Sequence, residues 1–121
     1  MRIVRRKEFL DLPAHTLYSP FEPHHTQGLH VKLHTTVPYE EHGGDFLYQS
    51  IELSLDSPTG GDWADALFKA MEDSKLSLTM DFDCCGRDGL RENNQYYVVY
   101  EAKDLVGIIR LLQACLNAAE S

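Results

Sequence analysis

The chain of 121 residues has few cysteines, no long apolar run and no leader-like start. Two of its three cysteines, Cys84 and Cys85, are adjacent and poorly placed to bridge each other, so we expect reduced thiols. The longest apolar runs are too short to cross a bilayer, so we expect no membrane association. The charged segment 1–7 is followed by no apolar stretch typical of a signal peptide. These absences predict a cytoplasmic protein.

Basic residues are also scarce. Eleven Lys and Arg stand against 19 Asp and Glu, which gives a formal net charge of −8. Four of the basic residues lie within the first seven positions, so the rest of the chain is strongly acidic. Because such a surface repels phosphate backbones, we expect no direct nucleic-acid binding. The acidity remains compatible with docking on a basic protein surface.

What the chain does have is a cluster of histidines, and all six lie in one stretch: His15, His24, His25, His30, His34 and His42. On an extended strand His30 and His34 would share a face but lie about 13 Å apart, too far for one zinc ion. The loop histidines could meet only through folding. Because the chain has no HxH, HExxH or paired CxxC element, we predict no metal site and no cofactor.

Hydrophobic periodicity indicates a hairpin in the middle of the chain. Residues 29–35 alternate between apolar positions 29, 31 and 33 and polar positions 30, 32 and 34, which predicts a half-buried strand with its apolar side inward. Residues 46–53 alternate in the same way after a turn at 38–44. We expect the two strands to pair antiparallel.

The remaining elements follow from the same patterns. Strands are predicted at 3–4, 16–18, 76–82 and 95–101, the last a central strand because it is rich in Tyr and Val. A short helix is predicted at 5–12, and longer amphipathic helices at 62–73 and from 104 onward. The sequence therefore predicts one α+β domain over residues 1–121, a mainly antiparallel sheet of four to six strands with the two longer helices packed on one face.

Two carboxylates offer candidate catalytic chemistry. Asp81 and Asp83 lie two apart on the predicted strand 76–82, which places their side chains on one face about 6–7 Å apart. That separation could suit Mg²⁺ or acid–base work, but it also fits an ordinary strand end beside a glycine-containing turn. We expect binding rather than catalysis and assign no catalytic residue.

The segment 84–94 is the most distinctive loop. Arg87 and Arg91, flanked by glycines, could form a fork that binds a phosphate or carboxylate. The alternative is an internal ion pair with a neighbouring acid such as Asp88. The fork predicts a small anionic ligand.

Aromatic residues add to this candidate site. Tyr96 and Tyr97 are consecutive on a predicted strand, so one of them faces away from the helices and could stack on a base or anchor a partner. The predicted ligand-binding set is Arg87, Arg91, Tyr96, Tyr97, His30 and His34.

The same arrangement predicts assembly. The two longer helices can cover only one face, and we expect His30, Lys32, His34, Tyr48 and one of the two adjacent tyrosines on the other. Small domains seldom leave several aromatics on an open face. We therefore predict a homodimer formed through the open face or an edge strand.

Four short segments stand out in chain order: Ile3-Val4; Phe9-Leu10-x-Leu12-Pro13-x-x-Thr16-Leu17-Tyr18; Glu22-Pro23; and Asp81-Phe82-Asp83-x-x-Gly86-Arg87-Asp88-Gly89. With a closing amphipathic helix, they resemble small accessory proteins of tailed phages and prophages. The resemblance implies a bacterial host cell and action by binding to host components, and it carries no known activity.

Taken with the residues, it leads to the hypothesis of a non-catalytic, counter-defence binding protein that sequesters a host ligand such as a nucleotide-derived signal. The alternative is an acidic inhibitor that binds a host defence or transcription protein. A weaker alternative is a metal-dependent enzyme that uses Asp81 and Asp83 or the histidines.

Overall fold

A computed structural model describes residues 1–22, 25–40, 43–51, 60–83, 85–89 and 94–121. Its strands are β1 Arg2–Arg5, β2 Thr16–Glu22, β3 His25–Thr26, β4 His30–Glu40, β5 Gly43–Ser50, β6 Cys85–Arg87 and β7 Tyr96–Val99. Its helices are α1 Arg6–Leu10, α2 Gly60–Glu72 and α3 Ala102–Glu120. The α+β class is confirmed.

The strands form an antiparallel sheet in the order β1-β7-β2-β4-β5-β6, with the two-residue β3 beside β2. Strand β7 is last in the sequence but lies between β1 and β2, which confirms the predicted central strand. The pairing of β4 with β5 confirms the predicted hairpin. The last strand of the chain is therefore held on both sides by strands from its beginning.

The core lies beneath the short helix α1. Phe9 of this helix is fully buried and stacks on Tyr97 with ring centroids 4.0 Å apart. It meets Tyr18 and Phe46 edge-on at 4.7 and 5.0 Å. Leu10 lies beside Phe9 in the same cluster of buried residues. A single short helix thus covers the middle of one sheet face.

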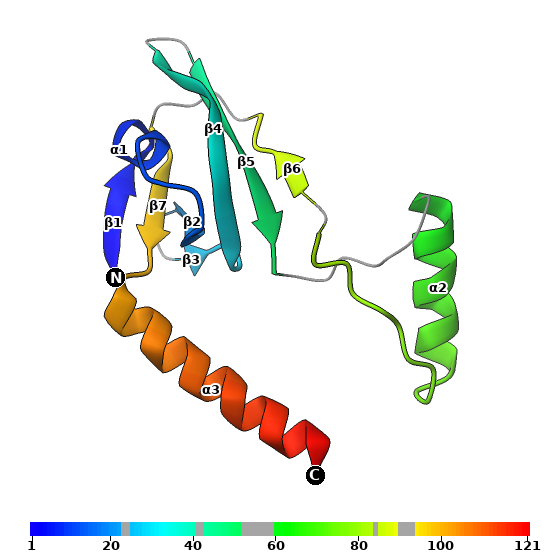
Figure 1. Ribbon diagram of the computed structural model, residues 1–121. Helices are drawn as coiled ribbons and strands as arrows, with labels where there is room; N and C mark the ends of the chain where they lie inside the picture. Colours follow the sequence, from blue (N-terminus) through cyan, green and yellow to red (C-terminus); the bar gives the residue numbers. More distant parts are fainter. Residues whose placement is uncertain (23–24, 41–42, 52–59, 84, 90–93) are drawn as a thin grey trace.

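The helix that covers the sheet is not one of the two expected from the sequence. We expected the two longer helices on one face, but α3 leaves the end of β7 and runs away from the sheet, and α2 stands apart from it (Figure 1). No residue of α3 is buried. The physical reason is that α1 follows β1 directly and already places two large apolar side chains over that face.

The facing of β4 also requires a correction. Polar positions 30, 32 and 34 were predicted to point away from the core, yet Lys32 is only 1 % exposed. Its ammonium donates hydrogen bonds to the carbonyl oxygens of Leu12 and Leu33, at 2.9 and 3.1 Å, and to the hydroxyl of Thr35 at 3.0 Å. The prediction is wrong for this face because nearby backbone carbonyls satisfy a buried ammonium; of the three positions, 34 alone is exposed.

The corrected facing of β4 also alters the open sheet face that was expected to form a dimer. Tyr48 pairs with Lys32 across β4 and β5 and lies on the α1 side, as does His30, whose ring is 5.5 Å from that of Tyr18. These side chains therefore do not form an open histidine-lined face.

The predicted strand at 76–82 is not formed. Within it the structure has a single bridge residue, Met80, and no ladder. Conversely, the predicted loop 84–94 contributes the edge strand β6, which pairs with β5. The alternation of 76–82 lacks a neighbouring strand in the described part of the chain, and alternation alone does not create one.

Two glycines give a matched test of the packing. Gly44 has φ of +127°, and an added Cβ would lie 2.6 Å from Leu10 Cδ1 and 3.3 Å from Tyr39 Cα. Gly107, within α3, has open space around the same position. We expect Gly44→Ala to destabilise the fold by about 2 kcal/mol or more, and Gly107→Ala to stabilise its helix by up to about 1 kcal/mol. Urea unfolding of both variants measures this, and equal effects would contradict it.

Lys32 gives a second prediction. Lys32→Ala should lower the free energy of unfolding by about 2–4 kcal/mol, since it removes three hydrogen bonds and leaves a cavity. Lys69→Ala on the exposed helix α2 should change the free energy of unfolding little.

The stability difference between the wild type and Lys32→Ala should also depend on pH. Burial lowers the pKa of Lys32 below its usual 10.5. The unfolded chain then keeps this proton to higher pH than the folded chain, so wild-type stability relative to the variant rises as pH approaches 10.5. Urea titrations across that range measure both effects, and a flat difference would contradict the second.

Candidate functional site

A pocket of about 470 Å³ opens on the same sheet face as α1. Its lining comes from β2, β4, β5 and β7 and from the segments beside β4, β6 and β7: Tyr18, Pro20, Glu22, Gln27, His30, Tyr48, Asp88, Gln95 and Tyr97. Strand alternation explains the set, because positions 18, 20 and 22 of β2 share one face. The sheet therefore gathers side chains from distant segments around one hollow.

Aromatic rings form much of the pocket wall. Tyr18 lies 5.8 Å from Tyr97 in an edge-on arrangement, and His30 lies 5.4 Å from Tyr48, also edge-on. Burial raises the pKa of both Tyr18 and Tyr97 well above the usual value. Their hydroxyl groups are therefore protonated at neutral pH and able to donate hydrogen bonds.

His30 lines the pocket with its imidazole ring. Its Nε2 lies 2.9 Å from the carbonyl oxygen of Gln27, which can only accept, so Nε2 carries the proton. In the neutral ring Nδ1 is then an acceptor. Nδ1 is buried, and no protein group in the described residues bonds to it. Because Nδ1 is buried, it is not open to a ligand in the pocket, and the ring is the part of His30 that lines it.

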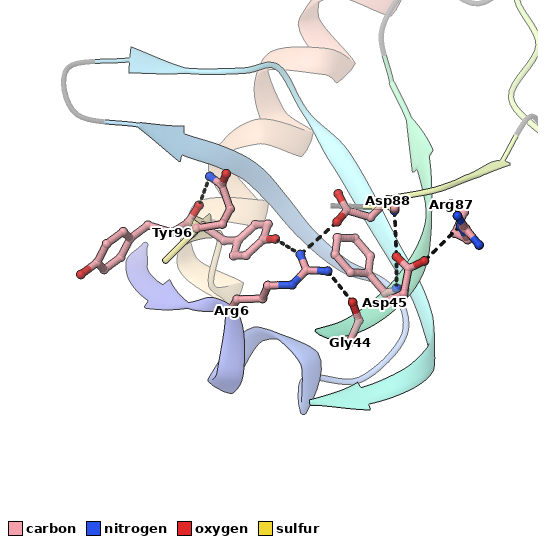
Figure 2. Close-up of polar contacts among 10 residues, drawn as sticks. Arg6, Gly44, Asp45, Arg87, Asp88 and Tyr96 are labelled. Carbon is pink, nitrogen blue, oxygen red and sulfur yellow. Dashed lines mark hydrogen bonds and ion pairs between the residues drawn. The ribbon is translucent and has the colours of Figure 1, made fainter. Parts of the chain in front are cut away.

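Arg6 holds two residues of the pocket wall in place. Its guanidinium is fully buried and donates hydrogen bonds to Asp88 Oδ2 at 2.9 Å, the Tyr97 hydroxyl at 2.6 Å and the Gly44 carbonyl oxygen at 2.8 Å (Figure 2). The planar fork of arginine suits three acceptors in different directions. It holds the two pocket groups, Tyr97 and Asp88, in place.

A second ion pair accounts for Arg87. Asp45 is almost fully buried, and its carboxylate accepts hydrogen bonds from the backbone N–H groups of Phe46 and Gly89, each at 2.9 Å. Arg87 Nε lies 3.1 Å from the other oxygen (Figure 2). The internal ion pair, the alternative to an anion fork, is thus present, although with Asp45 rather than a loop neighbour. Arg91 lies outside the described residues.

The structure separates the remaining predicted site residues. His30 and Tyr97 both line the pocket. Tyr96 lies on the opposite face beneath Arg5, whose guanidinium carbon is 5.5 Å from the ring centre, which confirms that one of the two adjacent tyrosines points away from the helix-covered side. Arg87 and His34 do not line the pocket. Two members of the predicted set are therefore brought together.

Sequence reasoning missed several lining residues, notably Tyr18, Glu22 and Asp88. The period-2 pattern of segment 16–22 could have grouped the first two, had the strand been extended past the proline at position 20. The sequence does not indicate that Arg6 is buried, because the residue lies in a run of basic residues that is typical of a solvent-exposed N-terminal segment.

The other candidates have simple structural roles. Asp81 Oδ1 accepts a hydrogen bond from the backbone N–H of Asp83 at 2.9 Å, as in a turn. In the described residues no three His, Cys, Asp or Glu are grouped to hold a metal ion. His24, His42 and the side chain of His25 lie outside what is described. Cys85 and Cys115 are free, exposed thiols. No described helix is long and apolar enough to cross a membrane.

Comparison with protein-family models, characterised proteins and solved structures finds no match. Function is therefore inferred from the chemistry of the pocket.

Arg6 supplies a test of how the pocket is held. We expect Arg6→Met to reduce the free energy of unfolding by about 3–5 kcal/mol, because it removes one cation beside Asp88 and the donors to the Tyr97 hydroxyl and the Gly44 carbonyl oxygen. Arg5→Met, one residue earlier on an exposed position, should change it by less than about 1 kcal/mol. Chemical denaturation compares the two, and similar losses would contradict the assigned role.

Proposed function

We propose that this protein binds and sequesters a small molecule whose flat nitrogen heterocycle, such as a nucleobase, enters the pocket. The observation that carries the proposal is a hollow of about 470 Å³ whose lining includes three tyrosines and the ring of His30. Pockets of this size commonly hold small organic ligands, with few polar groups that fix orientation.

The wall favours a ring over an aliphatic chain. Tyr18 and Tyr97 are almost fully buried, so the half-buried ring of Tyr48 is the tyrosine surface open to a ligand. A stacked base gains about 1–3 kcal/mol on such a side chain. His30 lines the pocket with a second planar ring. A purine or pyrimidine is a planar group that can lie against both rings.

Charge refines the expected ligand. Sequence analysis predicted a small anion held by Arg87 and Arg91, but Arg87 pairs with Asp45 and does not line the pocket. The described lining residues include no lysine or arginine that a phosphate could bind. For a nucleotide-derived signal, the base would enter and the phosphates would remain outside.

Binding is favoured over catalysis because the groups best placed to transfer a proton are already engaged. The Asp88 carboxylate and the Tyr97 hydroxyl both accept hydrogen bonds from Arg6. Their role is to shape and hold the pocket, which suits a protein that sequesters a ligand without changing it.

Calorimetry tests the proposal with three probe classes: nucleosides, the matching nucleotides including cyclic dinucleotides, and ribose 5-phosphate as a probe without a base. We expect compounds with a base to bind and ribose 5-phosphate not to bind. His30→Ala should weaken binding roughly tenfold or more, while His34→Ala, on the same strand but outside the pocket, should leave it unchanged. Absence of heat with all bases, or equal loss in both variants, would contradict the proposal.

The acidic-inhibitor hypothesis is a second candidate, favoured by the net charge of −8. It predicts a stoichiometric protein partner from host extract whose affinity falls as salt rises. A phage or prophage origin, with action in the cytoplasm of a bacterial host, remains a prediction of the resemblance.

A further inference from the structure

Helix α3 presents an apolar stripe with no cover in the described chain. Its large apolar side chains Ile109, Leu111, Leu112 and Leu116 are 50–70 % exposed. The helix is 19 residues long, and in proteins most helical stability comes from packing of an amphipathic face. A partner that covers the stripe would therefore stabilise the helix.

The total surface of the chain gives the size of the missing contact. A compact protein of 13.8 kDa exposes about 6,600 Å², whereas this chain exposes 8569 Å². The excess is about 2,000 Å², to which α2, with its exposed Phe68 and Met71, contributes together with α3. A stable homodimer buries on the order of 1,000 Å² or more from each chain. The uncovered surface is therefore large enough for a stable dimer contact.

The charge of α3 favours a second copy as the partner. The helix carries two basic residues, Lys103 and Arg110, and two acidic residues, Asp104 and Glu120, so its net charge is zero in a chain of −8. Two such acidic chains repel least where their contact is neutral. A basic protein partner would instead be drawn to the acidic surface elsewhere.

The spacing along α3 suits pairing with an identical helix. Apolar or small residues recur at steps of three and four: Leu105, Ile108, Leu112, Cys115 and Ala119. The exposed residues Ile109, Leu111 and Leu116 flank this line, so both sets belong to one stripe of the helix. This is the seam of a two-helix contact, in which side chains of one helix fit between those of the other. A two-fold axis makes the same stripe self-complementary. We propose that the protein forms a homodimer in which α3 packs against α3 of a second copy.

This contact replaces the open-face dimer expected from the sequence, and it is independent of ligand binding in the pocket. Sedimentation equilibrium of the full chain tests it with three variants. Leu112→Asp places a charge in the seam. Asn117→Asp adds the same charge to the same helix, on its polar side. Leu112→Ala shortens the seam side chain while keeping a good helix former.

We expect a wild-type mass of about 28 kDa, twice 13.8 kDa. Leu112→Asp should raise the dimer dissociation constant by roughly 100-fold or more, and Leu112→Ala by roughly tenfold, with Asn117→Asp close to wild type. If Leu112→Asp fails to fold by circular dichroism, Leu112→Ala decides. A monomeric wild type at every concentration, or a dimer unaffected by both Leu112 changes, overturns the proposal.

Discussion

The buried guanidinium of Arg6 is the interaction on which the domain most depends. Its three partners, Gly44, Asp88 and Tyr97, lie 38, 82 and 91 residues away in the sequence. It therefore ties the first helix to the β5 strand, to the segment after β6 and to the central strand β7. A buried charge costs several kcal/mol unless it is paired and fully hydrogen-bonded. Here an ion pair and two neutral acceptors offset much of that cost, while the buried Nε has no hydrogen-bond partner among the described residues. The same contacts fix the pocket.

Lys32 is a second buried cation beside the aromatic core. Its ammonium lies 5.9 Å from the centre of the Phe9 ring, and the guanidinium carbon of Arg6 lies 5.6 Å from that of Phe46. The aromatic core is thus small and bounded by two buried cations. A core of this kind needs only one short helix to close it. The apolar faces of the two longer helices remain uncovered, which is why the fold leads directly to the question of assembly.

Much of the architecture follows from local patterns, because the hairpin, the central β7 strand and the two longer helices have clear periodicity. The inward face of β4 could not be predicted in the same way. Alternation divides a strand into two faces, but it does not say which is buried when distant carbonyls, such as that of Leu12, can solvate a lysine. The site shows the same limit. Local patterns were sufficient to select His30 and Tyr97, but they could not identify Asp45 as the partner of Arg87, because the two residues are 42 positions apart in the sequence.

The location of the cations also shapes what the surface can bind. Arg6 and Lys32 are buried in the core, and the charge of Arg87 is balanced by Asp45 at 3.1 Å. The accessible surface therefore has a smaller share of the positive charge than the composition suggests. A free anion meets a repulsive exterior, so recognition by an uncharged planar ring in a pocket is physically easier than recognition by phosphate. Self-association faces the same repulsion, and a contact through the neutral α3 helix keeps the acidic bodies apart.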